Sequence, residues 1–132
     1  GAKPLFSPSV MAAINPRQPD ILALGMAGDV FDYDDLVSEG IPDTARSSDG
    51  SQIAWAWLAN MSPGDRLRLA LSGPDGRRVA ENTTEPLDRS KAVYFSYTGK
   101  KGGPAPGSYR LEVAVIRDGK PLVSRIETIK VE

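Results

Sequence analysis

The chain is 132 residues long, carries a net charge of −1 and contains neither cysteine nor histidine. This length predicts one domain, and 40% hydrophobic residues are enough for a core that needs no disulfides. The balanced, scattered charges exclude the basic surface typical of nucleic-acid-binding proteins. The longest apolar runs, 21–24 and 53–59, are far too short to cross a bilayer, so we expect no membrane insertion.

Residues 1–50 are expected to form an irregular, partly helical flank. Ser7 is a suitable N-cap for a short helix, which ends before Pro16 because proline cannot continue a helix. The apolar run 21–24 predicts a short strand.

A dense acidic cluster accompanies a second predicted helix. Asp32 is a suitable N-cap for a helix at 33–39, and Gly40 suits its C-terminal end. The cluster consists of Asp29, Asp32, Asp34, Asp35 and Glu39. Carboxylates are Ca²⁺ ligands, but the spacing lacks the glycine and the distal glutamate of an EF-hand loop. We therefore favour helix capping, and we predict no metal site and no cofactor.

From residue 51 onward the sequence alternates as strands do, and Gly- and Pro-rich turns recur about every ten residues. Together with 21–24, the predicted strands are 53–58, 67–71, 79–83, 92–98, 109–115 and 122–131. This spacing favours an all-β antiparallel sandwich of immunoglobulin or fibronectin-III type. We predict a single domain over 1–132, in which 51–132 is the strand-rich core. The polar strand 79–83 is expected at a sheet edge.

The final hairpin has the clearest strand pattern. Apolar residues alternate from Tyr109 onward, and Asp118–Gly119 suits a tight turn. A change of phase between Ile126 and Ile129 predicts a bulge. Tyr109 stands where sandwiches place a corner tyrosine, whose hydroxyl bonds to nearby backbone. The residues expected to be buried are Trp55, Leu67, Leu69, Phe95, Tyr109, Leu111 and Val113.

The missing residue types exclude most catalytic chemistry. Without histidine and cysteine there is no Ser-His-Asp triad, no thiol nucleophile and no typical zinc site. The remaining carboxylates and lysines form no recognisable motif. We predict that the chain is not an enzyme and has no catalytic residues.

Five aromatic residues on two predicted strands are the main candidate binding surface. They are Trp55, Trp57, Tyr94, Phe95 and Tyr97. Such rings can form a platform for sugar rings, but two tryptophans on one strand face also suit a sandwich core. We favour the core for Trp55. Both interpretations stay open for Trp57, which lies nearer the strand end.

Several stretches of turn and strand sequence occur together. They are Ser62–Gly76, Pro86–Ala92, Pro106–Val113 and the Arg117–Gly119 turn, preceded by Leu5–Pro8 near the start of the chain. Together they resemble the C-terminal accessory domain of bacterial lysostaphin-type zinc peptidases, which act on peptidoglycan. The zinc ligands and catalytic histidines of that family have no counterpart here, because the chain has no histidine.

The resemblance implies a non-catalytic accessory module that binds or positions, associated with a cell-wall peptidase in the periplasm or outside the cell. Its expected partners are a zinc peptidase catalytic domain or peptidoglycan, and we expect a monomer. If it binds the wall, the expected binding residues are Trp57, Tyr94, Tyr97, Lys100 and Lys101. The alternative is a structural or protein-interaction sandwich of a surface or secretion component, with the edge strand 79–83 accepting a partner strand.

Overall fold

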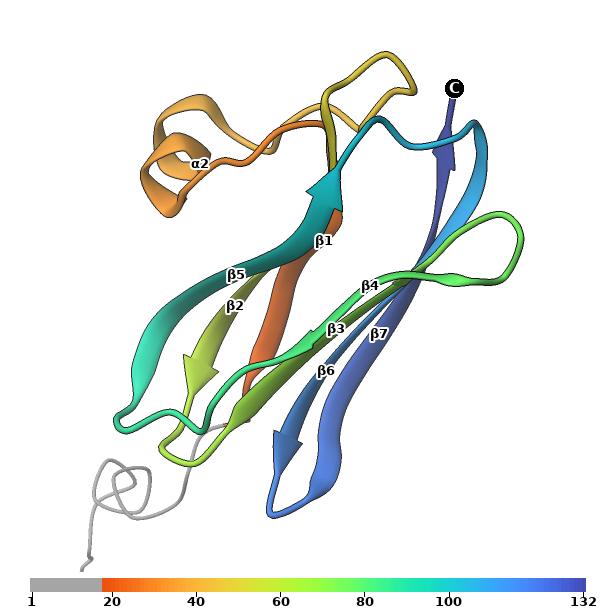
Figure 1. Cartoon of the computed structure of the whole chain (residues 1–132). Coiled ribbons are helices and arrows are strands. Elements are labelled where there is room, and N and C mark those ends of the chain that lie inside the picture. The colour runs from red at the N-terminus through yellow and green to blue at the C-terminus, as the bar shows by residue number, and fades with distance from the viewer. Residues whose placement is uncertain (1–17) are drawn as a thin grey trace, which may run out of the picture.

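The computed structural model describes residues 18–132, which form seven strands and one short helix (Figure 1). The elements are β1 (Asp20–Ala27), α2 (Tyr33–Glu39), β2 (Ser51–Met61), β3 (Arg66–Ser72), β4 (Arg78–Thr83), β5 (Lys91–Lys101), β6 (Gly107–Arg117) and β7 (Lys120–Val131). The helix predicted after Ser7 lies outside the described residues.

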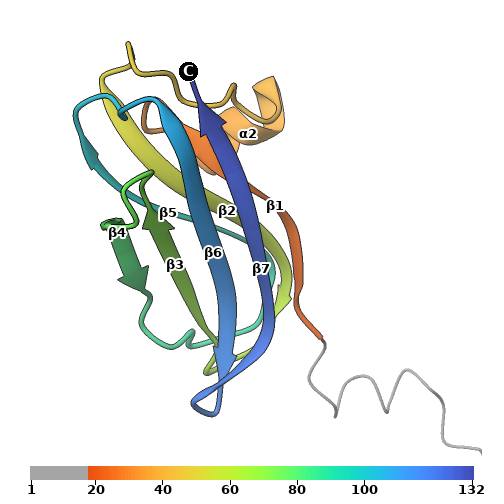
Figure 2. The same ribbon diagram turned by 90° about the vertical axis from the view of Figure 1, so that its right-hand side faces the viewer.

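The strands form two antiparallel sheets that pack face to face (Figure 2). One sheet has the order β1-β2-β5 and the other the order β4-β3-β6-β7. The predicted all-β sandwich is confirmed, and β4 lies at a sheet edge as expected. Because β4 pairs with β3, the sheet that contains the first strand has three strands and the other sheet has four. In an immunoglobulin constant domain the sheet with the first strand has four strands and the other has three. β1, within the segment expected as a flank, is one of the strands of the sandwich.

The core between the sheets is mainly aliphatic. Its members on β3 and β6, all almost fully buried, are Leu67, Leu69, Leu71, Leu111, Val113 and Val115. Strand β2 meets them with Ala54, Ala56 and Leu58. The two alanines leave room for the larger leucines of the facing sheet, as the close packing of a protein interior requires.

Tyr109 packs against this core and anchors the connection before β6. Its side chain is buried, and its hydroxyl donates a hydrogen bond to the carbonyl oxygen of Ala105 at 2.7 Å. Burial raises the pKa of this hydroxyl, and the charge of Asp75 adds to the rise. The predicted corner tyrosine is therefore confirmed.

The bulge predicted between Ile126 and Ile129 is wrong. β6 and β7 pair regularly there, and the register shifts only near the turn, between Val115 and Ile116. The change of phase arises because Arg125 and Glu127 take the positions opposite the core residues of β6, while Ile126 points to the outside. A charged pair at core-side positions is tolerated because β7 is an edge strand.

A buried ion pair, which the sequence analysis did not identify, joins the β2–β3 turn to the final hairpin. The Asp65 carboxylate is fully buried and accepts two hydrogen bonds from the Arg117 guanidinium, at 2.8 and 2.9 Å. It also accepts the backbone N–H of Ser62 at 2.8 Å. Burial raises the pKa of Asp65, but the hydrogen bonds from Arg117 and Ser62 outweigh it, so the pKa lies below its ordinary value.

Candidate binding face

Four aromatic residues of β2 and β5 lie on the outer face of the three-stranded sheet, namely Trp55, Trp57, Phe95 and Tyr97. Because residues alternate along a strand, Trp55 and Trp57 point away from the second sheet while Ala54 and Ala56 point toward it. Trp55 is only 2% exposed, so its predicted burial is confirmed. Its predicted place in the core between the sheets is wrong, because it belongs to a separate outer cluster. Phe95, predicted to be buried, is only half-buried in the same cluster.

We call this surface the outer aromatic face. Its members are Phe31, Tyr33, Trp55, Trp57, Phe95 and Tyr97. The sheet supplies four of them at paired positions, because Trp55 lies opposite Tyr97 and Trp57 opposite Phe95. Phe31 and Tyr33 come from the segment that follows β1.

The segment 28–50 covers part of this face. Asp32 and Asp35 form a capping box that begins α2, since each side chain accepts the backbone N–H of the other residue. The capping interpretation of these two carboxylates is thus confirmed. Phe31, just before the helix, meets Trp55 edge-on with ring centres 5.7 Å apart. Gly25 of β1 allows the indole to lie flat on the strand, since a Cβ there would be 3.0 Å from the Trp55 ring.

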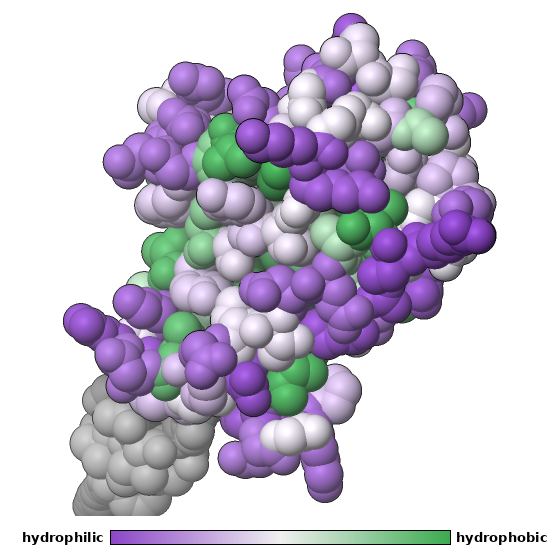
Figure 3. All heavy atoms as spheres, in the orientation of Figure 1, coloured by the Kyte–Doolittle hydropathy of each residue, from purple (hydrophilic) through white to green (hydrophobic). Residues whose placement is uncertain are grey.

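The rest of the face is open to solvent. Tyr33, Val93 and Tyr97 are 36%, 41% and 43% exposed. Tyr33 packs against Trp57 with ring centres 6.4 Å apart. In the described part of the chain, Trp57 Nε1 is the one buried side-chain polar atom without a hydrogen-bond partner. Figure 3 shows hydrophobic surface beside α2 and along the same side of the molecule, between hydrophilic residues.

Only two of the five predicted binding residues belong to this face. Trp57 and Tyr97 lie on it, whereas Tyr94 points to the other side of β5 and packs against the core between the sheets. Lys100 and Lys101 are exposed at the end of β5, opposite Gln52 and Ser51.

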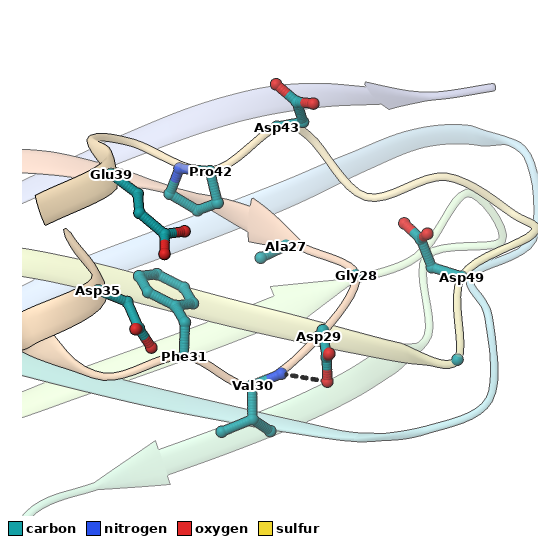
Figure 4. Close-up of a pocket in the computed structure, with 11 residues that line it drawn as sticks. Ala27, Gly28, Asp29, Val30, Phe31, Asp35, Glu39, Pro42, Asp43 and Asp49 are labelled. Atoms are coloured by element: carbon teal, nitrogen blue, oxygen red, sulfur yellow. Dashed lines mark hydrogen bonds between the residues drawn. The ribbon is translucent and has the colours of Figure 1, made fainter.

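An acidic cavity of about 540 Å³ lies beside the outer aromatic face and shares Phe31 with it (Figure 4). Its carboxylates are Asp29, Asp35, Glu39, Asp43 and Asp49, and no lysine or arginine lines it. Such a cavity attracts cations and repels anions. Within residues 18–132, however, no three acidic side chains converge as metal ligands do. The cavity cannot be recognised in the sequence, because its walls come from separate loop segments that only the fold brings together.

No protein-family model and no curated protein matches the sequence. The fold is similar to part of a protein from Bacteroides fragilis assigned as a β-galactosidase, with a TM-score of 0.52 at 15% identity. That likeness covers 88% of this chain but only 18% of the other. A Parabacteroides merdae β-glucuronidase (TM-score 0.49, 12% identity, 86% of this chain and 13% of that one) is less similar. An immunoglobulin-like protein from Pseudomonas aeruginosa is also less similar, with a TM-score of 0.45 at 16% identity. That likeness covers 89% of this chain and 98% of the other.

Identities this low show the fold alone. Among the described residues no helix is long and apolar enough to cross a membrane. The chain is an immunoglobulin-like β-sandwich with a partly covered aromatic face on its three-stranded sheet.

Proposed function

We propose that this chain is a non-catalytic accessory module that binds or positions, associated with a bacterial cell-wall zinc peptidase in the periplasm or outside the cell. The observation that carries the binding role is the outer aromatic face, on which Tyr33 and Tyr97 present exposed rings with hydroxyl groups beside the half-buried ring of Trp57. Aromatic rings with a polar edge suit ligands that are apolar on one face and hydroxylated at the rim. The sugar rings of peptidoglycan have that character.

The association with a peptidase rests on the sequence resemblance. The stretch Ser62–Gly76 forms the β2–β3 turn, β3 and the turn before β4, and Pro106–Val113 forms most of β6 with the corner tyrosine. These are positions that determine the fold. The proposed kinship rests on these positions, and the identity of the partner stays a prediction.

The non-catalytic role is supported by the chemistry of the side chains. The chain has no histidine or cysteine, and the buried carboxylate of Asp65 is held by Arg117 rather than aimed at a cavity. We expect no stoichiometric zinc after purification without chelators. Bound zinc, or cleavage of a peptidoglycan stem peptide that EDTA abolishes, would contradict this role.

A pull-down of the full chain on purified peptidoglycan tests the binding role. Tyr33→Ser removes one exposed ring from the face and should weaken retention by about twofold to tenfold, the range that a single aromatic contact supplies. Ile126→Ser is the matched control, because Ile126 is 49% exposed on β7 of the other sheet. No retention of the unmodified chain, or equal loss in both variants, would contradict wall binding. Titration with a purified lysostaphin-type catalytic domain then tests the positioning role separately.

The alternative is a structural or interaction sandwich of a surface or secretion component. The observation behind it is the position of β4 at a sheet edge, where backbone groups are unpaired, while the short length of β4 and the ion pairs of Glu81 oppose it. Solution scattering separates the two: dimers or filaments joined through β4 favour the alternative, and a monomer favours the accessory module.

A further inference from the structure

The sandwich has four edge strands, and three of them carry features that oppose pairing with another chain. β7 places the Arg125–Glu127 ion pair at core-side positions. β4 is six residues long and bears Glu81, which is paired with both Arg68 and Arg78. Short edges and charges of this kind block strand addition.

β1 is protected by its own irregularity and by a loop. Its register with β2 shifts between Ile21 and Ala23. The backbone N–H of Ala45 donates to the carbonyl oxygen of Met26 at 2.8 Å, so the loop 40–50 occupies part of this edge. Natural proteins also use β-bulges and covering loops to prevent an edge strand from pairing with another chain.

The stretch 92–99 of β5 carries none of these features. The whole strand is eleven residues long, pairs with β2 without a register shift, and has no charged residue between Ala92 and Gly99. Val93 and Tyr97 on this strand are exposed. Among the described residues, the backbone of 92–99 makes no hydrogen bond apart from its pairing with β2.

A second copy of this chain is a poor occupant of the β5 edge. Antiparallel pairing of the whole strand with itself would place Lys91 opposite Lys101 at both ends. Like charges directly opposite one another destabilise a strand pair. The residues from Lys91 to Lys101 include three lysines and no acidic residue, so the strand complements a segment of opposite charge.

We propose that the free edge of β5 binds an extended segment of another polypeptide by strand addition. The segment alternates apolar and polar residues along its core, and it carries acidic residues at the end that meets Lys100 and Lys101. Its backbone pairs with the edge, its apolar side chains pack beside Val93 and Tyr97, and its carboxylates meet the lysines. This inference does not depend on peptidoglycan binding or on a peptidase partner.

The test uses the isotopically labelled full chain and two synthetic peptides, with binding followed by amide chemical shifts. Both peptides have ten residues of alternating valine and threonine. One carries two glutamates at its N-terminus, the end that antiparallel pairing places beside Lys100 and Lys101, and the other carries two lysines there. N-methylation of alternate residues leaves each peptide one edge for pairing and prevents its self-association. We expect shifts concentrated in 92–99, and tighter binding of the glutamate peptide by about twofold to thirtyfold, which two exposed ion pairs can supply.

Three variants sharpen the test. Tyr97→Lys puts a charge on the free edge of β5 and should abolish peptide binding. Ile126→Lys changes a similarly exposed residue on β7 and should leave peptide binding intact. Replacing Lys100 and Lys101 with glutamate should reverse the preference between the peptides. Tyr33→Ser should leave peptide binding unchanged, which separates this edge from the surface tested with peptidoglycan.

Four results would overturn the proposal. They are shifts centred on β4 or β7, no binding of either peptide, equal loss in Tyr97→Lys and Ile126→Lys, and a charge preference that the lysine substitutions do not change. Thermal unfolding of each variant shows whether a loss of binding reflects a loss of fold.

Discussion

Strand β2 has two apolar faces that meet different surroundings. On the inner face Ala54 and Ala56 pack against the aliphatic residues of a complete second sheet. On the outer face Trp55 and Trp57 meet no second sheet, and the segment 28–50 with its short helix lies over part of them. Trp55 is as well buried as the inner residue Leu69, at 2% against 1% exposed. Burial by itself therefore does not place a residue between the sheets.

The second sheet and the segment 28–50, which lie over the two faces of β2, also differ in the interactions that hold them in place. The second sheet is held by ladders of backbone hydrogen bonds along β3, β6 and β7. The segment 28–50 is held by ring contacts and a few backbone hydrogen bonds, such as the one between Ala45 and Met26. Damage to the inner core should therefore lower the stability of the whole domain, and damage to the outer cover should act mostly locally.

The largest expected loss follows removal of the buried carboxylate at one end of the sandwich. Asp65→Ala leaves the Arg117 guanidinium without this partner in a largely buried position. We expect the free energy of unfolding to fall by about 3–5 kcal/mol, because the change removes one partner of a buried, doubly hydrogen-bonded ion pair. Urea unfolding of the two proteins measures the change. A loss below about 1 kcal/mol, as for an exposed ion pair, would show that solvent reaches this pair.

Truncation in the inner core should cost nearly as much. Leu69 is almost fully buried among the residues of both sheets, so Leu69→Ala should lower the free energy of unfolding by about 2–5 kcal/mol. Urea unfolding is again the measurement. If the loss is under about 0.5 kcal/mol, the inner face has been assigned wrongly.

Acid should remove part of the stabilisation that Asp65 provides. Its pKa in the folded protein is lowered, so the unfolded chain takes up the proton first as the pH falls. The contribution is complete above about pH 4, the ordinary range of an aspartate, and is lost as the pH falls through the lowered pKa. Asp65→Asn should therefore show a smaller drop in urea midpoint between pH 6 and pH 2.5 than the unmodified protein. Equal drops would mean that other carboxylates account for the acid sensitivity.

Removing the outer cover should have the smallest effect on stability. Phe31 is half-buried between Trp55 and Phe95, with ring centres 5.7 and 5.0 Å away. We expect Phe31→Ala to cost about 1–2 kcal/mol, less than a fully buried phenylalanine. Calorimetric unfolding of Phe31→Ala beside Leu69→Ala gives the comparison. A larger loss in Phe31→Ala would mean that the outer cluster, rather than the space between the sheets, is the main core.

Local patterns in the sequence predicted the strands, the capped helix at 33–39 and the corner tyrosine, because each depends on neighbours in the chain. The inward face of β2 could not be predicted, since both of its faces are apolar and alternation does not say which one meets a second sheet. The Asp65–Arg117 pair joins two turns that are 52 residues apart in sequence. Each of these residues alone is typical of an exposed turn, and only the fold brings them together.

Native tryptophan fluorescence tests the division between the two clusters most directly, because both tryptophans of the chain lie on the outer face. Phe31→Ala should expose Trp55 to water and shift the native emission to longer wavelength. Leu69→Ala should lower the urea midpoint and leave the native emission unchanged. The reverse pattern, with a shifted native emission in Leu69→Ala and none in Phe31→Ala, would place the tryptophans between the sheets and contradict the existence of an outer aromatic face.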